Sequence, residues 1–564
     1  MTGLETLDWV VIGAYFAILA GVAVWASRNQ DTSKDYFLAG RNIGWFVIGA
    51  SLFATNIGSE HIVGLAGSGF QDGVAMAHYE LHAWCLLVLG WLFVPFYMRS
   101  GVYTMPEFLE RRYSPAARWI LSVISLVAYV FTKVSVTVYA GGKVFQTLFP
   151  EASMLGMDAF WVGAFSTVIL TGLYTVTGGL RAVVFTDTMQ TVVLVIGSLA
   201  VTTFGLIKIG GWSNVRAAVG SEHLNLWKPA NHPDFPWVGM LFCAPIVGLW
   251  YWCTDQYIVQ RTLAARNMTQ ARRGTIWGAY LKLLPVWLFI VPGLIAYALY
   301  LNGQLEMPPL KIGGQIVLDA AGKIVPDRDA TFAAMVQALL PIGIRGLVVA
   351  GLLAALMSSL SSLFNSTSTL FTIDVYKKLH PQASEKTLVR VGRIATACVV
   401  ALGIAWIPVM QRVGGGLYLY LQAVQAYLAP PITAVFFLGV FYKRINSQGA
   451  IAGLVCGFIL GMLKLGAWVW TASSPDTAPS LVWTFHNFNF LYFALVLFGV
   501  SVVIVVVASL FSPPPQDEQI RGLTYATTAG EHKAETRASW NKWDVINTLI
   551  ILATITAVYV YFSG

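Results

Sequence analysis

Charged residues are scarce in this chain of 564 residues. Asp, Glu, Lys and Arg together account for 11% of it, whereas hydrophobic residues account for 57%. A typical soluble domain carries about 25% charged residues, so the composition excludes a soluble enzyme or binding module. Apolar runs long enough to cross about 30 Å of hydrocarbon recur along the whole length. The sequence therefore predicts a polytopic helical membrane protein.

Cysteines and nucleotide-binding motifs are also few. The five cysteines lie in or beside apolar runs without any Cys-x-x-Cys pair, so we expect small buried residues rather than a disulfide or metal framework. The glycine run at 414–420 lacks the Lys-Ser/Thr of a phosphate-binding loop. No Lys or Arg precedes the first apolar run and Arg28 follows it, which is the polarity of a retained span rather than of a cleaved signal peptide.

Hydropathy predicts fourteen membrane spans that belong to one domain. Lys and Arg gather in alternate loops, which by the positive-inside rule face the cytoplasm and place both termini outside a cell membrane. The segment 512–542, before the last span, is polar, and we expect it to be a loosely ordered cytoplasmic linker. The predicted spans are 8–26, 43–69, 79–98, 117–147, 158–177, 182–208, 237–260, 274–301, 331–371, 390–410, 416–440, 447–469, 487–511 and 543–562.

The stretch SLFATNIGSEHIVGLAGSGF at 51–70 is unusually polar for a membrane helix and contains four glycines. A continuous helix satisfies its own backbone, whereas a break frees carbonyl and N–H groups that must be buried in protein or face a wet cavity. Freed carbonyls are good ligands for a hard cation. Packing of small residues alone explains the glycines but not the polar groups. The sequence therefore predicts a break around Asn56–Ser59 with a binding site beside it.

A second span, 243–263, has related features. Pro245 and Gly248 weaken its helix, and Thr254, Asp255 and Gln256 lie near its cytoplasmic end. Two interrupted spans at corresponding places in two halves point to an inverted-repeat transporter with a site near the middle of the membrane.

The ninth span is rich in serine. Ser358, Ser361 and Ser362 fall close to one helix face, with Ser359 beside them. Neutral oxygens at this density suit Na⁺, which takes several hard oxygen ligands. Helix packing with hydroxyls bonded to the i−4 carbonyls is the structural alternative.

Ionisable and aromatic groups inside the spans suggest a sugar site. Intramembrane charges are functional candidates, and Glu80 and Lys282 are of a kind that can bridge the hydroxyls of a polyol. Structural ion pairs are the alternative for both. Three aromatic residues offer flat apolar faces to a sugar ring: Tyr79, Tyr251 and Trp252.

Five segments closely resemble the sodium/glucose cotransporter group of the sodium:solute symporter family. They are ASLFATNIGSEHIVGLAGSG, GGLRAVVFTDTMQT, LWYWCTDQYIVQRTLAARNM, LMSSLSSLFNSTSTLFTIDVYKK and LQAVQAYLAPPITAVFFLGVFYKR. The resemblance covers nearly the whole chain. It implies an all-α membrane protein of the leucine-transporter-type fold, with about fourteen helices and two five-helix inverted repeats. The repeats would be 43–208 and 237–442, with an extra helix and loop at 1–42 and three C-terminal helices at 443–564.

The resemblance also implies two sodium sites, a sugar pocket and gates. One Na⁺ would bind the backbone carbonyls of Ala54, Ile57 and Ala355 and the hydroxyls of Ser358 and Ser359. A second Na⁺ would bind Ser361, Ser362 and Asp187. The sugar pocket would use Asn56, His61, Tyr79, Glu80, Lys282 and Gln422, with Trp252 beside the inner-gate residue Tyr251. Outer-gate positions would be Leu65, Tyr129 and Tyr418.

Three positions depart from the family pattern. Gly248 stands where relatives carry a polar or hydroxyl side chain, and Thr137 and Leu419 each replace an Asp of some members. These departures bear on the preferred sugar and on gating, and not on the class of protein.

We therefore predict a Na⁺-coupled symporter, not an enzyme, that imports a hexose such as glucose or galactose with two Na⁺ per sugar. The alternatives are the same fold and coupling with myo-inositol, a sialic acid, a monocarboxylate or another small solute, or a sugar-gated sensor. Glu80 favours a neutral polyol over an anion. An intramembrane enzyme using Glu60 and His61 is disfavoured, because adjacent helical side chains diverge by about 100° and no HExxH or GxSxG motif is present.

Overall fold

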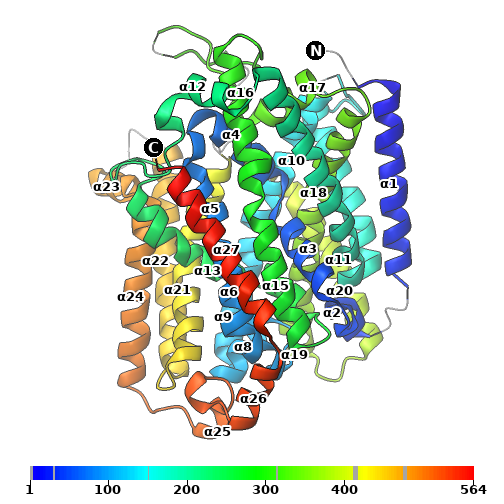
Figure 1. The fold of residues 1–564 in the computed structure, drawn as a ribbon. Helices are drawn as coiled ribbons and strands as arrows, with labels where there is room; N and C mark the ends of the chain where they lie inside the picture. Colours follow the sequence, from blue (N-terminus) through cyan, green and yellow to red (C-terminus); the bar gives the residue numbers. More distant parts are fainter. Residues whose placement is uncertain are drawn as a thin grey trace.

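Long apolar helices make up nearly all of the structure (Figure 1). A computed structural model describes residues 4–28, 32–149, 151–312, 315–319, 321–410, 417–473 and 479–563. It describes the backbone alone at 59–60, 130–132, 135, 177, 311–312, 406–410, 417–420 and 472–473.

Sixteen elements precede residue 239, and they include the first six predicted spans. In chain order they are α1 (Thr6–Ala26), α2 (Ser33–Leu38), η1 (Ala39–Arg41), α3 (Trp45–Asn56), α4 (Ser59–Gln71), η2 (Gly73–Met76), α5 (Ala77–Leu81), α6 (Trp84–Val88), η3 (Leu89–Phe93), α7 (Val94–Ser100), α8 (Met105–Arg112), α9 (Pro115–Ala128), η4 (Tyr129–Val134), α10 (Ser135–Leu148), α11 (Ala159–Ile209) and α12 (Trp212–His223).

The described part of the chain from residue 239 onward includes the other eight predicted spans and a short antiparallel pair of strands. Its elements are η5 (Gly239–Cys243), α13 (Ala244–Cys253), α14 (Gln256–Leu263), α15 (Met268–Leu283), η6 (Val286–Ile290), α16 (Val291–Leu301), β1 (Lys311–Ile312), β2 (Gln315–Ile316), η7 (Arg328–Ala330), α17 (Thr331–Leu339), α18 (Ile344–Thr369), η8 (Leu370–Tyr376), α19 (Lys377–Leu379), α20 (Glu385–Met410), α21 (Leu417–Phe441), α22 (Ser447–Ser473), α23 (Ser480–Asn487), α24 (Phe490–Leu510), α25 (Asp517–Ile520), η9 (Tyr525–Thr527), α26 (Gly530–Ala538) and α27 (Lys542–Tyr561).

Among the described residues, eleven helices are long and apolar enough to cross a membrane, or twelve if α3 and α4 count as one bent span. The two remaining predicted spans fall on α9–η4–α10 and on η5–α13–α14. Fourteen spans therefore stay a prediction, while the helical membrane class is clear from the model.

The predicted break in the second span is confirmed. Helix α3 ends at Asn56, Ile57 has extended backbone angles, and α4 starts at Ser59. The two helices are bent by 61°. Backbone groups at the break are thereby released from helical pairing in the middle of the protein.

The second interrupted span breaks later than the weak residues suggested. Helix α13 ends at Cys253, and Asp255 caps the N-terminus of α14 by accepting a hydrogen bond from the N–H of Tyr257. Pro245 lies in the first turn of α13, where its missing N–H and fixed φ are tolerated. Gly248 remains inside α13. The position of the break is therefore indicated by the helix-capping residue Asp255, and not by Pro245 or Gly248.

The prediction that 331–371 forms one continuous ninth span was wrong. The structure divides it into α17 and α18, separated by Leu340–Gly343. Pro341 disfavours a helical residue before it, and Gly343 has a φ of +86° that other residues rarely adopt. The serine-rich part lies wholly in α18.

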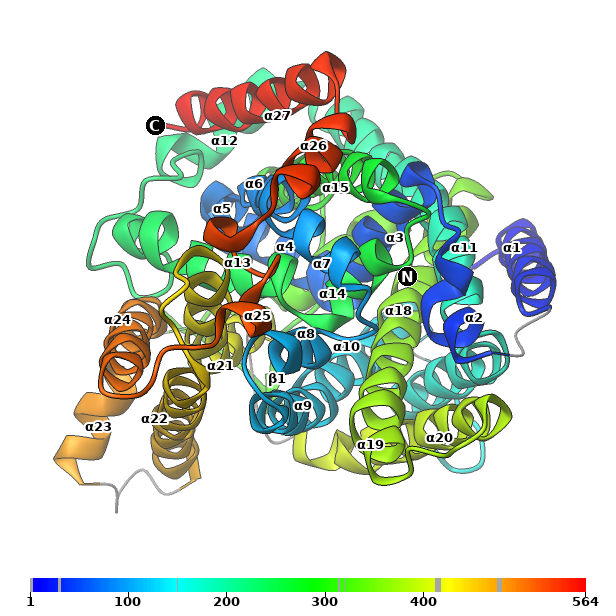
Figure 2. The ribbon, with the colours of Figure 1, turned by 90° about the horizontal axis from the view of Figure 1, so that it is seen from below.

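Figure 2 shows α1, α27 and the group α22–α24 at the rim, around a centre that includes α4, α13 and α14. In the most apolar 18-residue stretch of the span that begins with α18, 89% is buried inside the protein. The corresponding stretch of α27 is 22% buried. The serine-rich helix is thus an interior element, and the predicted C-terminal helices cover the outside.

The segment 512–542 is more ordered than predicted. It forms α25, η9 and α26 on the lower side of Figure 1. It is bonded to neighbouring helices and to one loop. Gln519 donates to the carbonyl of Tyr113 after α8, Tyr525 donates to that of Leu92 in η3, and Arg99 of α7 donates to that of His532. The basic residues that begin at Arg99 and the segment 512–542 therefore share one end of the molecule, as the alternation of charge requires.

The cysteines fulfil the expectation only in part. All five are free thiols, and three of them are buried. Cys398 and Cys456 are exposed instead, because they face outward from α20 and α22, where a membrane protein places apolar residues towards lipid.

Candidate functional site

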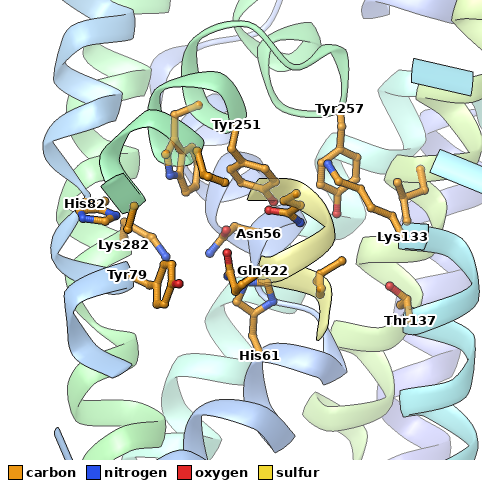
Figure 3. Close-up of a pocket in the computed structure, with 17 residues that line it drawn as sticks. Asn56, His61, Tyr79, His82, Lys133, Thr137, Tyr251, Tyr257, Lys282 and Gln422 are labelled. Atoms are coloured by element: carbon orange, nitrogen blue, oxygen red, sulfur yellow. The ribbon is translucent and has the colours of Figure 1, made fainter. Parts of the chain in front are cut away.

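One cavity lies beside the break between α3 and α4 (Figure 3). It encloses about 660 Å³ of empty space when its open part is included. Its walls come from α3, α4, α5, α10, α13, α14, α15, α18 and α21, together with η4. Seven of the eight residues predicted for the sugar pocket line it: Asn56, His61, Tyr79, Tyr251, Trp252, Lys282 and Gln422.

Glu80, the eighth predicted residue, lies behind this wall. Its Oε2 accepts a hydrogen bond from Lys282 Nζ at 2.6 Å, and the two side chains are 0% and 5% exposed. Glu80 Oε1 has no hydrogen-bond partner among the described residues. The pair thus presents the ammonium to the cavity and keeps a free carboxylate oxygen beside it.

The cavity wall contains both polar and aromatic side chains. Lys282 Nζ lies 5.7 Å from the ring centroid of Trp252, and Tyr251 meets Trp252 edge to face at 5.1 Å. Asn56 is 3% exposed, and its Nδ2 has no partner among the described residues. A buried amide of this kind is costly unless a ligand or water satisfies it, so the wall suits a solute that carries hydroxyl groups.

Five polar lining residues were not among those predicted for the pocket: His82, Lys133, Thr137, Tyr257 and Gln425. His82 follows Tyr79 by three residues, and Gln425 follows Gln422 by three. The i, i+3 spacing on a helix face would have found both. Tyr257 lies beyond the break in α14, where no helical spacing connects it to Tyr251.

Gly248 also lines the cavity, at one of the positions that depart from the family pattern. A Cβ there would lie 3.2 Å from Cys85 Sγ and 3.6 Å from His82 Nδ1. A side chain would therefore crowd Cys85, and the glycine lets Cys85 and His82 pack closely against α13.

The two helices that carry the residues predicted for the first sodium site, α3 and α18, are in contact. Ser359 Oγ lies 3.4 Å from the carbonyl oxygen of Thr55, which stands between Ala54 and the break. Ala355 and Ser358 lie within the preceding turn of α18 and are 3% and 0% exposed. Serine hydroxyls and released carbonyls are thus brought within one small buried region.

Asp187 is the centre of a second polar group. Its Oδ1 accepts from Ser358 at 2.6 Å, and its Oδ2 accepts from Ser51 at 2.6 Å and from Thr55 at 3.3 Å. Ser362 Oγ lies 3.1 Å from Thr55 Oγ1. Asp187 is fully buried, so a carboxylate and several hydroxyls converge on α3, α11 and α18.

Ser361, the other predicted ligand of the second Na⁺, points elsewhere in this structure. Its Oγ donates to the carbonyl of Ser358 at 2.9 Å, in the back-bonded form expected of a packed serine. Its role stays a prediction.

The outer-gate roles of Leu65, Tyr129 and Tyr418 stay a prediction. Leu65 is fully buried in α4, and Tyr129 donates a hydrogen bond to Asp255. Neither lines the described cavity. Tyr418 belongs to α21, but its side chain lies outside what the structure describes.

The model of the sodium:solute symporter family matches residues 36–457. This chain is a member of that family. The symporter is 39% identical to "Sodium/glucose cotransporter 1" of Sus scrofa, over 92% of this chain and 81% of the relative. It is 40% identical to "Sodium/myo-inositol cotransporter" of Canis lupus familiaris, over 93% and 76% of the two chains. It is 39% identical to the sodium/mannose cotransporter of Bos taurus, over 99% and 97%.

A solved structure of a Na⁺-coupled sialic acid symporter in an outward-open state has a similar fold. The TM-score is 0.70 at 22% identity, with 91% of this chain and 99% of that chain covered. The leucine-transporter-type fold is thereby confirmed. The symporter is a multi-pass membrane protein that couples solute movement to Na⁺, and it is not an enzyme.

Proposed function

We propose that this symporter imports a neutral hexose such as glucose or galactose. The cavity carries the proposal, because it combines a shielded carboxylate–ammonium pair with amides and aromatic rings (Figure 3). A sugar ring has an apolar face that suits Tyr251 or Trp252 and a polar rim that suits Asn56, Lys282 and Gln422. The Glu80–Lys282 pair is neutral overall, which suits an uncharged solute better than an ion.

We further propose that two Na⁺ ions bind along α18. The first would use the carbonyls of Ala54, Ile57 and Ala355 with the hydroxyls of Ser358 and Ser359. The second would use Asp187 with Ser361 and Ser362. The two groups share Ser358 and Thr55 as neighbours, which supports coupling between the ions.

The number of ions decides how steeply the sugar is concentrated. One Na⁺ moving down about 100 mV releases roughly 2.3 kcal/mol, and a tenfold concentration ratio adds about 1.4 kcal/mol. One ion therefore supports roughly 500-fold accumulation, and two support a ratio on the order of 10⁵.

Transport would follow alternating access between the repeats at 43–208 and 237–442. Outside, Na⁺ would favour the state in which the cavity accepts sugar, since both ligands act on one conformational equilibrium. Sugar would then close the outer gate, and movement of Tyr251 would open the way to the cytoplasm. The basic loops would face the cytoplasm and both termini would lie outside a cell membrane.

A different polyol is the main alternative. The similarity to a sodium/myo-inositol cotransporter is as high as that to a sodium/glucose cotransporter, and both solutes are uncharged rings with several hydroxyls.

A competition experiment separates these solutes. We expect glucose or galactose to displace a bound radiolabelled hexose from the purified protein in NaCl at lower concentration than myo-inositol does. A higher affinity for myo-inositol, mannose or a sialic acid would replace the substrate and leave the mechanism in place.

A further inference from the structure

A buried ion pair lies between the cavity and the break in the seventh predicted span. Lys133 Nζ of η4 and Asp255 Oδ2 are 2.5 Å apart, and the two side chains are 7% and 2% exposed. Asp255 is the N-cap of α14. The pair therefore joins the predicted fourth span, in the first repeat, to the broken seventh span, in the second.

Four aromatic rings surround the ammonium of Lys133. Its Nζ lies 4.7 Å from the ring centroid of Tyr251 and 4.5 Å from that of Tyr257, and 5.1 Å from those of Tyr129 and Trp250. Cation–π contacts of this kind strengthen when the cation is desolvated. Lys133 thus holds both Tyr251, the proposed inner gate, and Tyr257, which follows the break.

The same pair connects to the proposed first sodium site. Asp255 accepts hydrogen bonds from the Tyr129 hydroxyl and from the N–H of Tyr257. The Tyr257 hydroxyl in turn donates to the carbonyl of Thr55 at 2.5 Å. That carbonyl also accepts from Ser359 Oγ at 3.4 Å. A continuous chain of contacts therefore runs from the ion pair to the end of α3.

We propose that Lys133 and Asp255 form an inner latch that keeps the cytoplasmic side closed until sodium and solute are both bound. The proposal rests on the alternating-access function above. For α14 to move away from η4 the two charges must separate, which is costly in a buried site unless water enters. The latch therefore holds Tyr251 over the cavity, and opening it releases Tyr251 and Tyr257 together. Lys133 and Asp255 act here as positioning residues.

Weakening the latch should allow the protein to change state with Na⁺ alone. The test is the uptake of ²²Na⁺ into proteoliposomes that contain the full-length protein and no solute. Lys133→Met and Asp255→Asn each remove one charge while keeping side-chain length or shape. We expect each to raise this leak roughly fivefold or more, because a small bias in a two-state equilibrium changes the minor population strongly. The double variant should leak no more than either single variant, because one loss already breaks the pair.

A contact between Lys133 and the solute is the competing explanation, because Lys133 also lines the cavity on the side opposite His82 (Figure 3). If Lys133→Met abolishes solute binding while Asp255→Asn leaves both binding and leak at the wild-type level, the latch is wrong. Additive leaks in the double variant would also overturn it. Lys133→Arg keeps the charge and should hold the leak near the wild-type level.

Lys464→Met provides the matched control for removing a buried lysine. Lys464 is 1% exposed and donates to the carbonyls of His486 and Phe488, between α22 and the segment after α23. Lys464→Met should leave the Na⁺ leak unchanged. If it raises the leak as much as Lys133→Met does, the leak comes from a general loss of packing and not from the latch. Because no solute is present, a wrong substrate in the proposed function leaves this comparison intact.

Discussion

Glu80 and Lys282 form a direct ion pair, with Glu80 Oε2 2.6 Å from Lys282 Nζ and neither side chain more than 5% exposed. Of the two, Lys282 lines the cavity and Glu80 does not. Separated charges at this depth are costly, so each residue fixes the other. Glu80 consequently orients the ammonium that lines the cavity.

Glu80→Gln should weaken hexose binding roughly 10- to 100-fold, because hydrogen bonds that involve a charged group contribute about 1.5–3 kcal/mol. Equilibrium binding of radiolabelled hexose in saturating NaCl measures this. Lys378→Met is the control, since Lys378 pairs with Glu110 far from the cavity and is partly exposed. If Glu80→Gln binds hexose with wild-type affinity, the Glu80–Lys282 pair is not part of the binding site.

Ser359→Ala should raise the Na⁺ concentration for half-maximal transport roughly tenfold, since one ligand of a buried cation contributes about as much as a strong hydrogen bond. Hexose affinity at saturating Na⁺ should change little. Ser366→Ala on the same helix is the matched control, because Ser366 bonds to Gln260 instead. An equal shift in both variants would contradict a specific role of Ser359.

Asp187→Asn should remove the second ion and keep the first. The isosteric amide retains part of the hydrogen bonding with Ser51 and Ser358, so the fold should persist. The ratio of ²²Na⁺ to hexose flux should fall from two to one. A ratio of one in the unaltered protein would contradict the two-ion proposal, and a ratio of two in the variant would show that the Asp187 carboxylate is not needed for the second ion.

Asp8→Asn should destabilise the protein without changing solute specificity. Asp8 of α1 accepts from the N–H groups of Gly343 and Gly346 and from Arg345, whose Nη2 lies 2.7 Å from Oδ2. The carboxylate thus caps α18, the serine-rich helix, from outside the repeats. Breaking such a buried pair costs about 3–5 kcal/mol, so the unfolding temperature in detergent should drop by several degrees. An unchanged temperature would mean that α1 is not tied to α18 by this contact.

The sequence alone predicted those parts of the site that depend on local chemistry. The break at Asn56–Ser59 follows from polar groups and glycines within one apolar run, and the serine density of α18 follows from four hydroxyls within two turns. Family resemblance supplied the residue roles. However, local sequence patterns do not show which residues far apart in the chain form ion pairs. Glu80 and Lys282 are 202 residues apart, and Lys133 and Asp255 are 122 apart.

Other features depended on backbone geometry that hydropathy does not detect. Hydropathy joined α17 to α18 because Pro341 and Gly343 are short interruptions in an apolar run. It also gave no sign that 512–542 would bond to neighbouring helices and to one loop, since that segment is polar throughout. Order there comes from side chains that reach carbonyls exposed at helix ends, such as that of Tyr113.

The most direct test of the central claim is the uptake of radiolabelled glucose and galactose into proteoliposomes under an imposed Na⁺ gradient, compared with choline. The account predicts a transient accumulation above equilibrium in Na⁺ and none in choline, lost in both Ser359→Ala and Glu80→Gln at limiting ligand concentrations. Equal uptake in Na⁺ and choline, with the hexose still bound by the purified protein, would contradict sodium-coupled transport of these sugars.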